Sequence, residues 1–383
     1  MKVLLTLLFF SIPLSAQDAQ LGALRTTVMS LRAHPEDYRE TRGATAELTA
    51  AKHQLRDWIE SHLTKFAATG DPAALSDELH KGLGDAKLFC TDYNLECYPS
   101  SRGFLDEIQV SREGELLVIR TAVGIWCGYD YSAYIYKWSG ARWQRIWENE
   151  QNTYTAKNYH PQMIHAVHIS PPDDKGNRLL LTLGSQPGCA SAFQPVYYRV
   201  WQMNARYEVQ QRLLLDGTEM ANVGTDPPIE GRAGTNDVLM EFTAGGTGYG
   251  ESHKAVRHFE MRNGRAVQVE PIAPTLRDFV EEWLAAPWTE SASRSESPSL
   301  KQWHTKFHRD DGMGDFPDPA MRCTTSADLW QIGTHLHEEP KVYYLVRWTP
   351  PYHFIMAGVS ERPYPDCITR DPKGDEHPQL LTR

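Results

Sequence analysis

The sequence predicts an α+β protein that is mostly antiparallel β: tandem β-sheet repeats, propeller-like or stacked as β-modules, with N-terminal helices and a helical insertion before a C-terminal β segment. Two observations support this prediction. In the first part of the chain, apolar residues recur at every third or fourth position, which is the period of an amphipathic helix. From residue 105 onward they gather in short β-branched and aromatic runs between glycine-containing loops, which is typical of strands.

Residues 1–16 have the layout of a secretory signal peptide. Lys2 supplies the positive charge, an apolar run extends from Val3 to Leu14, and Ala16 offers a small residue for cleavage. The run is shorter than the ~20 residues that a membrane helix needs. We therefore expect export to the periplasm or the extracellular space, and we expect no membrane span.

Residues 17–88 are predicted to be an N-terminal helical region. The stripe of Leu21, Leu24 and Val28 has helical spacing, and two further helices are expected after it. The last of these starts at Asp71-Pro72, because aspartate favours the N-cap and proline favours the first helical position.

Residues 89–272 are predicted to be a β-repeat region with three units, near 104–150, 162–215 and 222–272. Their first long strands start at Leu116, Leu179 and Val238, which are 63 and 59 residues apart. A repeat of this length, with three or four antiparallel strands in each unit, is typical of propeller blades or tandem β-modules. Three units are too few for a closed propeller, which has at least four blades.

The second unit starts with Asp173-Asp174-Lys175-Gly176-Asn177, just before its first long strand. This Asp/Gly-rich start resembles that of integrin-like FG-GAP propeller repeats. The resemblance is confined to this loop and is absent from the other two units. It implies no function for the chain.

After the repeats we expect a helix and a serine-rich linker at 273–300, followed by a C-terminal α/β segment at 301–383 that is a candidate to complete the β body. Residues 276–284 match residues 55–63 at five of nine positions. Two interpretations stay open. The match reflects either a duplicated helix–helix–strand unit or two amphipathic helices of similar pattern.

The six cysteines are predicted to form disulfides, because their number is even and the expected compartment is oxidising. The preferred pairs are Cys90–Cys97 across a short turn, Cys323–Cys367 at the C-terminal segment, and Cys127–Cys189 at matching positions of neighbouring units. Spacing alone leaves other pairings open.

The loops that follow the first long strand of each unit are rich in glycine and aromatic residues. If the units are equivalent, these loops gather on one face, where rings can stack on a ligand and polar groups can orient it. The candidate binding residues are Trp126, Tyr129, Asp130, Tyr131, Tyr249, Glu251 and His253. The alternative is that the glycines serve tight turns and the rings cover the end of the sheet.

A candidate metal site consists of His304 and His308, one helical turn apart, with Asp311 after them. The glutamate that zincins place beside the first histidine is missing, and the EF-hand spacing is absent. We therefore expect no metal and no other cofactor.

No catalytic residues can be assigned. The sequence lacks Gly-x-Ser-x-Gly and Ser-x-x-Lys. The glycines at 246–250 do not have the dinucleotide-binding spacing. The net charge of −10 argues against a nucleic-acid partner.

These observations favour an exported, non-catalytic binding or interaction module whose partner is a glycan, a peptide or a protein. The alternative is a secreted hydrolase, carbohydrate-active or metal-assisted, with a carboxylate site such as Asp130 with Glu251. A concave pocket that holds two carboxylates would favour the enzyme, whereas a shallow face with scattered acids would favour binding.

Overall fold

The computed structural model describes residues 14–33, 44–89, 105–125, 128–152, 163–186, 193–222, 227–245, 253–308, 319–334, 341–374 and 380–381. The chain divides into two compact units, residues 1–163 and 164–383. None of the described helices is long and apolar enough to cross a membrane.

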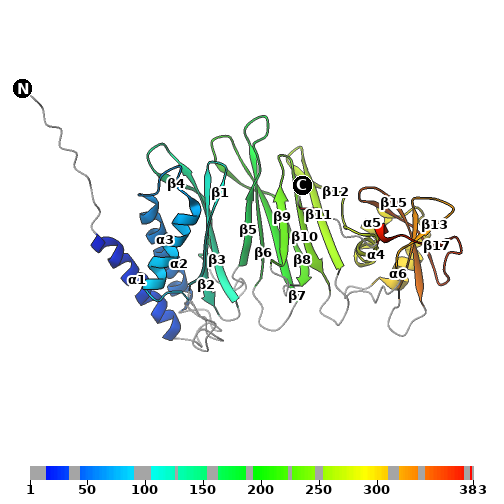
Figure 1. Cartoon of the computed structure of the whole chain (residues 1–383), viewed down its shortest axis with the longest axis horizontal. Coiled ribbons are helices and arrows are strands. Elements are labelled where there is room, and N and C mark those ends of the chain that lie inside the picture. Colours follow the sequence, from blue (N-terminus) through cyan, green and yellow to red (C-terminus); the bar gives the residue numbers. More distant parts are fainter. Residues whose placement is uncertain are drawn as a thin grey trace, which may run out of the picture. The chain divides into compact units, whose positions relative to one another are not determined.

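The first unit packs helices on one face of an antiparallel sheet (Figure 1). The helices are α1 (Leu14–Ala33), α2 (Ala44–Leu63) and α3 (Pro72–Asp85). The sheet has the order β1 (Leu105–Glu113), β2 (Leu116–Ile125), β3 (Gly128–Trp138) and β4 (Trp143–Asn149). Asp71 caps α3 as predicted, since its side chain accepts a hydrogen bond from the Ala73 amide at 3.0 Å.

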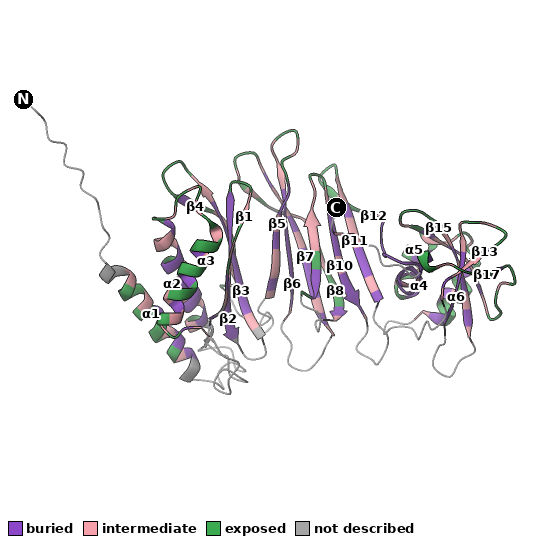
Figure 2. Ribbon diagram, viewed as in Figure 1, coloured by how far each residue is buried: buried purple, intermediate pink, exposed green. Residues whose placement is uncertain are grey.

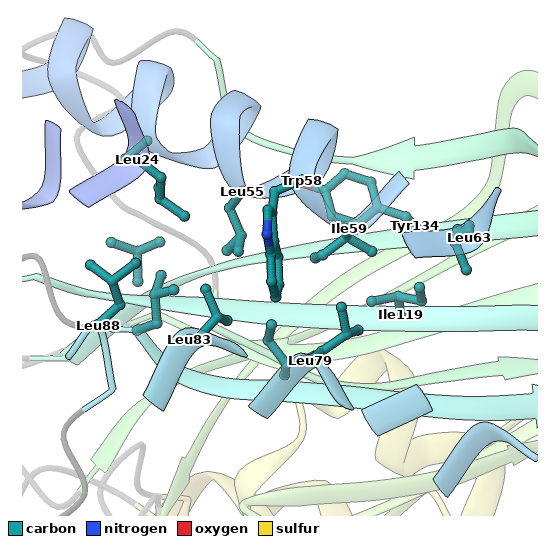
Figure 3. Packing of buried hydrophobic residues seen from close by; sticks show 14 of the residues in the cluster. Leu24, Leu55, Trp58, Ile59, Leu63, Leu79, Leu83, Leu88, Ile119 and Tyr134 are labelled. Carbon is teal, nitrogen blue, oxygen red and sulfur yellow. The ribbon is translucent and has the colours of Figure 1, made fainter. Parts of the chain in front are cut away.

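The core of this unit lies between the helices and the sheet. Trp58 extends from α2 towards the leucines of α3, as Figure 3 shows. Leu117, Ile119 and Val123 of β2 belong to the same apolar cluster. A Cβ atom at Gly82 would lie 2.9 Å from Trp58 Cζ2, so this glycine permits the close approach of α3 to α2. Each fully buried leucine or isoleucine side chain in this core contributes about 1.5–3 kcal/mol to folding.

The second unit begins with an eight-stranded sheet. Its strands are β5 (Met163–Ile169), β6 (Arg178–Ser185), β7 (Phe193–Met203), β8 (Val209–Asn222), β9 (Ile229–Ala233), β10 (Asp237–Ala244), β11 (His253–Arg262) and β12 (Arg265–Val269). They form two antiparallel meanders, β5–β8 and β9–β12. The pairing of Ala221 with Ala244 joins the meanders, and one shared apolar cluster draws on both.

A third sheet follows, preceded by helices. The helical elements are α4 (Leu276–Ala285), α5 (Trp288–Ser291), the 3-10 turn η1 (Ala292–Arg294) and α6 (Leu300–Phe307). The strands are β13 (Met321–Cys323), β14 (Leu329–Thr334), β15 (Val342–Thr349), β16 (His353–Ser360) and β17 (Cys367–Arg370), and η2 (Pro372–Gly374) comes last. The sheet order is β16-β15-β14-β13-β17.

Helices cover this third sheet, and Phe279 of α4 stacks on Phe354 of β16 with ring centroids 5.5 Å apart. The C-terminal strands therefore form a sheet of their own and do not extend the eight-stranded sheet. The segments 55–63 and 276–284, which share a sequence pattern, both lie in helices, α2 and α4. Residues 288–294, expected to belong to a linker, form α5 and η1.

The predicted α+β class with mostly antiparallel β-structure is confirmed. Within the described ranges the strands form three sheets, and no closed propeller is present. Figure 2 shows that buried residues are concentrated in the strands and on the inner faces of the helices. The predicted disulfide Cys323–Cys367 is present and joins β13 to β17. The other cysteines, Cys90, Cys97, Cys127 and Cys189, lie outside the described residues.

The Asp/Gly-rich loop before β6 closes on itself. Asp173 Oδ1 accepts hydrogen bonds from the amides of Lys175 and Asn177, at 2.8 and 2.7 Å. Gly176 takes the left-handed conformation, with φ of +80°, that the tight turn requires. The loop thus satisfies its aspartate with its own backbone.

Candidate functional site

The predicted binding residues fall in both units. Tyr129, Asp130 and Tyr131 lie in β3 of the first unit, whereas His253 is the first residue of β11 in the second. Trp126, Tyr249 and Glu251 lie outside the described residues. The expected gathering of the three loops therefore stays a prediction.

Asp130 is buried in the first unit, where its partner is a lysine of α2. Lys52 Nζ lies 2.9 Å from Asp130 Oδ2, and both side chains are fully buried. The same ammonium group donates to the Gln151 carbonyl. Tyr129 and Tyr131 meet edge to face, with ring centroids 6.2 Å apart. Removing one partner of such a buried pair is costly, so Lys52 holds α2 against the sheet.

His304 and His308 are adjacent, and both contact the end of α4. Their rings stack with centroids 5.1 Å apart. His304 Nε2 lies 3.0 Å from the Ala286 carbonyl oxygen, and His308 Nδ1 lies 2.6 Å from that of Leu284. Burial lowers the pKa of His304. The two rings thus supply hydrogen-bond partners for carbonyl groups at the C-terminal end of α4, which have no partner within the helix.

Asp311, the third candidate metal ligand, lies outside the described residues. Within the part of the chain that the structure describes, no group of three or more His, Cys, Asp or Glu side chains is arranged to hold a metal ion.

His253 belongs instead to the wall of a cavity of about 480 Å³ in the second unit, which we call the α4 pocket. Its walls come from β7, β8, β10, β11, β12, α4, α5 and η1. Charged residues of both signs line it: Glu219, His253, Arg257, Glu281, Glu282, Glu290 and Arg294. Apolar surface comes from Phe259, Ile272 and Trp283, and Gly245 of the third glycine-rich loop also lines the pocket.

The start of α4 is fixed against β11, and this places its acidic residues. Thr275 caps the helix by accepting a hydrogen bond from the Asp278 amide at 3.2 Å. The Asp278 carboxylate accepts in turn from the Lys254 amide at 2.8 Å. These hydrogen bonds join the capped first turn of α4 to the backbone of β11. Glu281 and Glu282 follow one turn further along α4, so the helix holds them at a fixed position in the pocket wall.

His253 lies between these two carboxylates. Its Nε2 donates to Glu282 Oε1 at 2.9 Å. Its Nδ1 lies 3.1 Å from Glu281 Oε2, which is close enough for an ion pair but is not aligned as a hydrogen bond. All three side chains are at least nine-tenths buried.

Arg257 continues the network across the pocket wall. Its Nη1 donates to Glu282 Oε2 at 3.0 Å, and its Nε donates to Glu219 Oε1 at 2.9 Å. Tyr198 also donates to Glu219, at 3.3 Å. One hydrogen-bonded chain therefore joins β7, β8, β11 and α4.

The network holds its members in defined charge states. Burial alone would lower the pKa of His253, but the contacts with Glu281 and Glu282 outweigh burial and raise it to about 10. Burial alone would raise the pKa of Glu282, but the charges of Arg257 and His253 lower it to about 2. For Glu281 burial prevails, and its pKa is raised.

The sequence pattern points to His253 but not to its partners Glu281 and Glu282, nor to Arg257, which pairs with Glu282. One signal was present in β11. His253 and Arg257 have the same strand parity as Ala255 and Phe259, which lie in the apolar cluster. Charged residues on an otherwise apolar strand face indicate buried polar partners. The pattern does not identify those partners, which come from β8 and α4.

No protein-family model matches the chain, and no curated protein matches it. One solved structure found by comparison is an alpha-L-arabinanase mutant from Cellvibrio cellulosa. Sequence identity is 11%, the TM-score is 0.24, and the match covers 74% of this chain and 86% of the other. At a TM-score this low, the match supports no conclusion about the fold or function of this chain.

Proposed function

We propose that residues 164–383 bind a small polar molecule in the α4 pocket and that the chain is an exported binding protein. The observation behind the proposal is a cavity of about 480 Å³ whose charged wall is organised before any ligand arrives. Small-molecule sites are typically cavities of ~300–1,000 Å³ with apolar walls and a few fixed polar groups. This pocket replaces the glycine-rich loop face as the preferred site, with His253 common to both.

The charge states in the wall favour binding over catalysis. General acid–base catalysis works best with groups whose pKa lies near the working pH. His253, with a pKa of about 10, stays protonated near neutral pH, and Glu282, with a pKa of about 2, stays ionised. Both are therefore suited to fixing the shape and charge of the wall and poorly suited to exchanging protons.

Filling the pocket tests the proposal. Ala286 lines the cavity, so Ala286→Trp places an indole in the space of the ligand. In a fragment screen by ligand-observed NMR, we expect bound fragments for the wild-type chain and loss of those signals in this variant. Ala74→Trp on the exposed face of α3 is the matched control and should keep them. Equal binding to all three proteins, or no binding to the wild type, would refute the pocket.

One observation favours the hydrolase alternative. The pocket is concave, and its adjacent carboxylates Glu281 and Glu282 have pKa values shifted in opposite directions. Such a split is how one site supplies both an acid and a base. Turnover of 4-nitrophenyl glycosides or 4-nitrophenyl acetate that is lost in Glu281→Gln would establish the enzyme. The binding proposal expects no turnover in either protein.

We further propose export through residues 1–16. The disulfide Cys323–Cys367 supports the proposal, since such bonds persist in oxidising compartments. Expression of the full chain in a bacterium should give a periplasmic protein whose intact mass corresponds to a chain that starts at Gln17. Ala16→Arg should block cleavage. Cytosolic protein that retains Met1 in both cases would contradict export.

A further inference from the structure

Arg294 lines the α4 pocket but takes no part in the ion network that joins Glu219, Arg257, Glu282 and His253. It lines the cavity from η1 and is half-buried. Arg257, in contrast, is held by Glu219 and Glu282. Within the described residues, no hydrogen bond or ion pair engages the Arg294 guanidinium. Its five N–H donors are therefore open to a ligand.

The backbone around Arg294 is anchored on both sides. Trp283 Nε1 donates to Ser295 Oγ at 2.9 Å, and Ser295 Oγ donates to the Ser291 carbonyl at 2.8 Å. The Glu296 amide donates to the Met356 carbonyl at 2.9 Å, and before Arg294 the Ser291 hydroxyl donates to the Trp283 carbonyl at 2.7 Å. The guanidinium therefore projects from a fixed segment, and binding does not require the segment to be ordered first.

The position of Arg294 has an energetic cost that a ligand can offset. Burial lowers the pKa of Arg294, although the charges of Glu282, Glu270 and Glu290 partly oppose this. None of these carboxylates hydrogen-bonds to it. A planar, singly charged anion would supply both the opposite charge and two parallel hydrogen bonds.

We propose that Arg294 binds the carboxylate of a small monocarboxylate ligand whose apolar part lies along Phe259 and Ile272. This inference rests on the proposed binding function of the α4 pocket. Glu219 and Glu290 also line the cavity, so a second negative charge on the ligand would meet like charges. A dianion such as a phosphate monoester is therefore disfavoured.

Matched probe pairs test this assignment on the full chain. Phenylacetate and phenylacetamide differ mainly in charge, and their dissociation constants can be measured by titration calorimetry or NMR. We expect the wild type to bind phenylacetate about tenfold more tightly than the amide, as a hydrogen-bonded charge pair would give. In Arg294→Gln this preference should vanish. Arg265→Gln, which removes an exposed arginine of β12 outside the pocket, should retain it.

The outcomes separate this inference from the proposed function. Equal binding of acid and amide to the wild type, no binding of phenylacetate, or an unchanged preference in Arg294→Gln would overturn the role of Arg294. If neutral fragments still bind and Ala286→Trp still abolishes their binding, the pocket stands. If Ala286→Trp blocks no fragment at all, the proposed function itself fails.

Discussion

Arg257 of β11 and Glu282 of α4 form a largely buried ion pair, with Nη1 and Oε2 3.0 Å apart, that ties the eight-stranded sheet to the helix that lines the pocket. Both partners have further contacts, Arg257 with Glu219 and Glu282 with His253. The pair therefore stands at the centre of the network. Its energetics depend on how completely each charge is satisfied.

Breaking this pair should be much costlier than removing it. Arg257→Met leaves Glu219 without its cation and Glu282 with His253 as its remaining cation, so we expect the free energy of unfolding to fall by about 3 kcal/mol or more. Adding Glu282→Leu removes one of the stranded charges, and the double variant should lose less than the sum of the single losses. Urea unfolding followed by tryptophan fluorescence gives the free energy of unfolding of Arg257→Met, of Glu282→Leu and of the double variant. Additive losses would show that the pair is not coupled.

The same network predicts how stability depends on pH. The pKa of His253 is raised from 6.5 to about 10 on folding, so its contribution is complete below pH 6.5 and is lost as the pH rises towards 10. The pKa of Glu282 is lowered from 4.5 to about 2, so its contribution is present above pH 4.5 and is lost as the pH falls towards 2.

Urea midpoints measured from pH 6.5 to 10 check the basic limb. The wild type should lose stability over this range, and His253→Gln should flatten the decline because it removes the titrating group. His258→Gln is a useful comparison, since the pKa of His258 is also raised by its hydrogen bond with Asp237. Parallel curves for wild type and His253→Gln would rule out the proposed charge state.

The disulfide between β13 and β17 should stabilise the C-terminal sheet. It links residues 44 positions apart, for which the chain-entropy model gives about 4 kcal/mol. Cys323→Ser with Cys367→Ser should lower the thermal midpoint, and a reducing agent should do the same for the wild type. In the double variant the reducing agent should have no effect through this bond. A wild type that is insensitive to reduction would contradict the prediction.

Local sequence patterns predicted the elements better than their assembly. The apolar run at the start of β2 and the Asp71-Pro72 cap of α3 depend on neighbours a few residues apart, and both are read directly from the chain. The C-terminal strands were recognisable as strands. Their pairing into a separate sheet was not, because an apolar strand face has the same pattern whichever sheet it joins.

Local sequence patterns could not predict the pocket, because the side chains that meet in its wall come from distant parts of the chain. Arg257 meets Glu219 from 38 residues away and Glu282 from 25 residues away. Glu281 and Glu282 look like ordinary solvated helix residues in a sequence, since acidic residues are rarely buried without partners. Only the tertiary fold reveals that their partners are present. His253 was selected for its loop, and its role in the ion network was not foreseen.

Gly217 gives a sharp test of how the pocket wall is built. It pairs with Tyr198 across β8 and β7, and a Cβ atom at Gly217 would overlap the Tyr198 ring. The ring is buried, and its hydroxyl donates to Glu219. Gly217→Ala should therefore displace the ring and destabilise the fold by about 1–3 kcal/mol, the usual cost of overpacking.

Two further variants separate the steric cause from the hydrogen bond. Tyr198→Phe keeps the ring and removes only the hydroxyl, so we expect a loss of about 1 kcal/mol. Tyr198→Leu combined with Gly217→Ala frees the space that the methyl group needs, and the double variant should be less destabilised than the two single losses added together. Urea unfolding gives the free energies. If Gly217→Ala is neutral, the glycine is not needed to seat the ring, and Tyr198 approaches Glu219 for another reason.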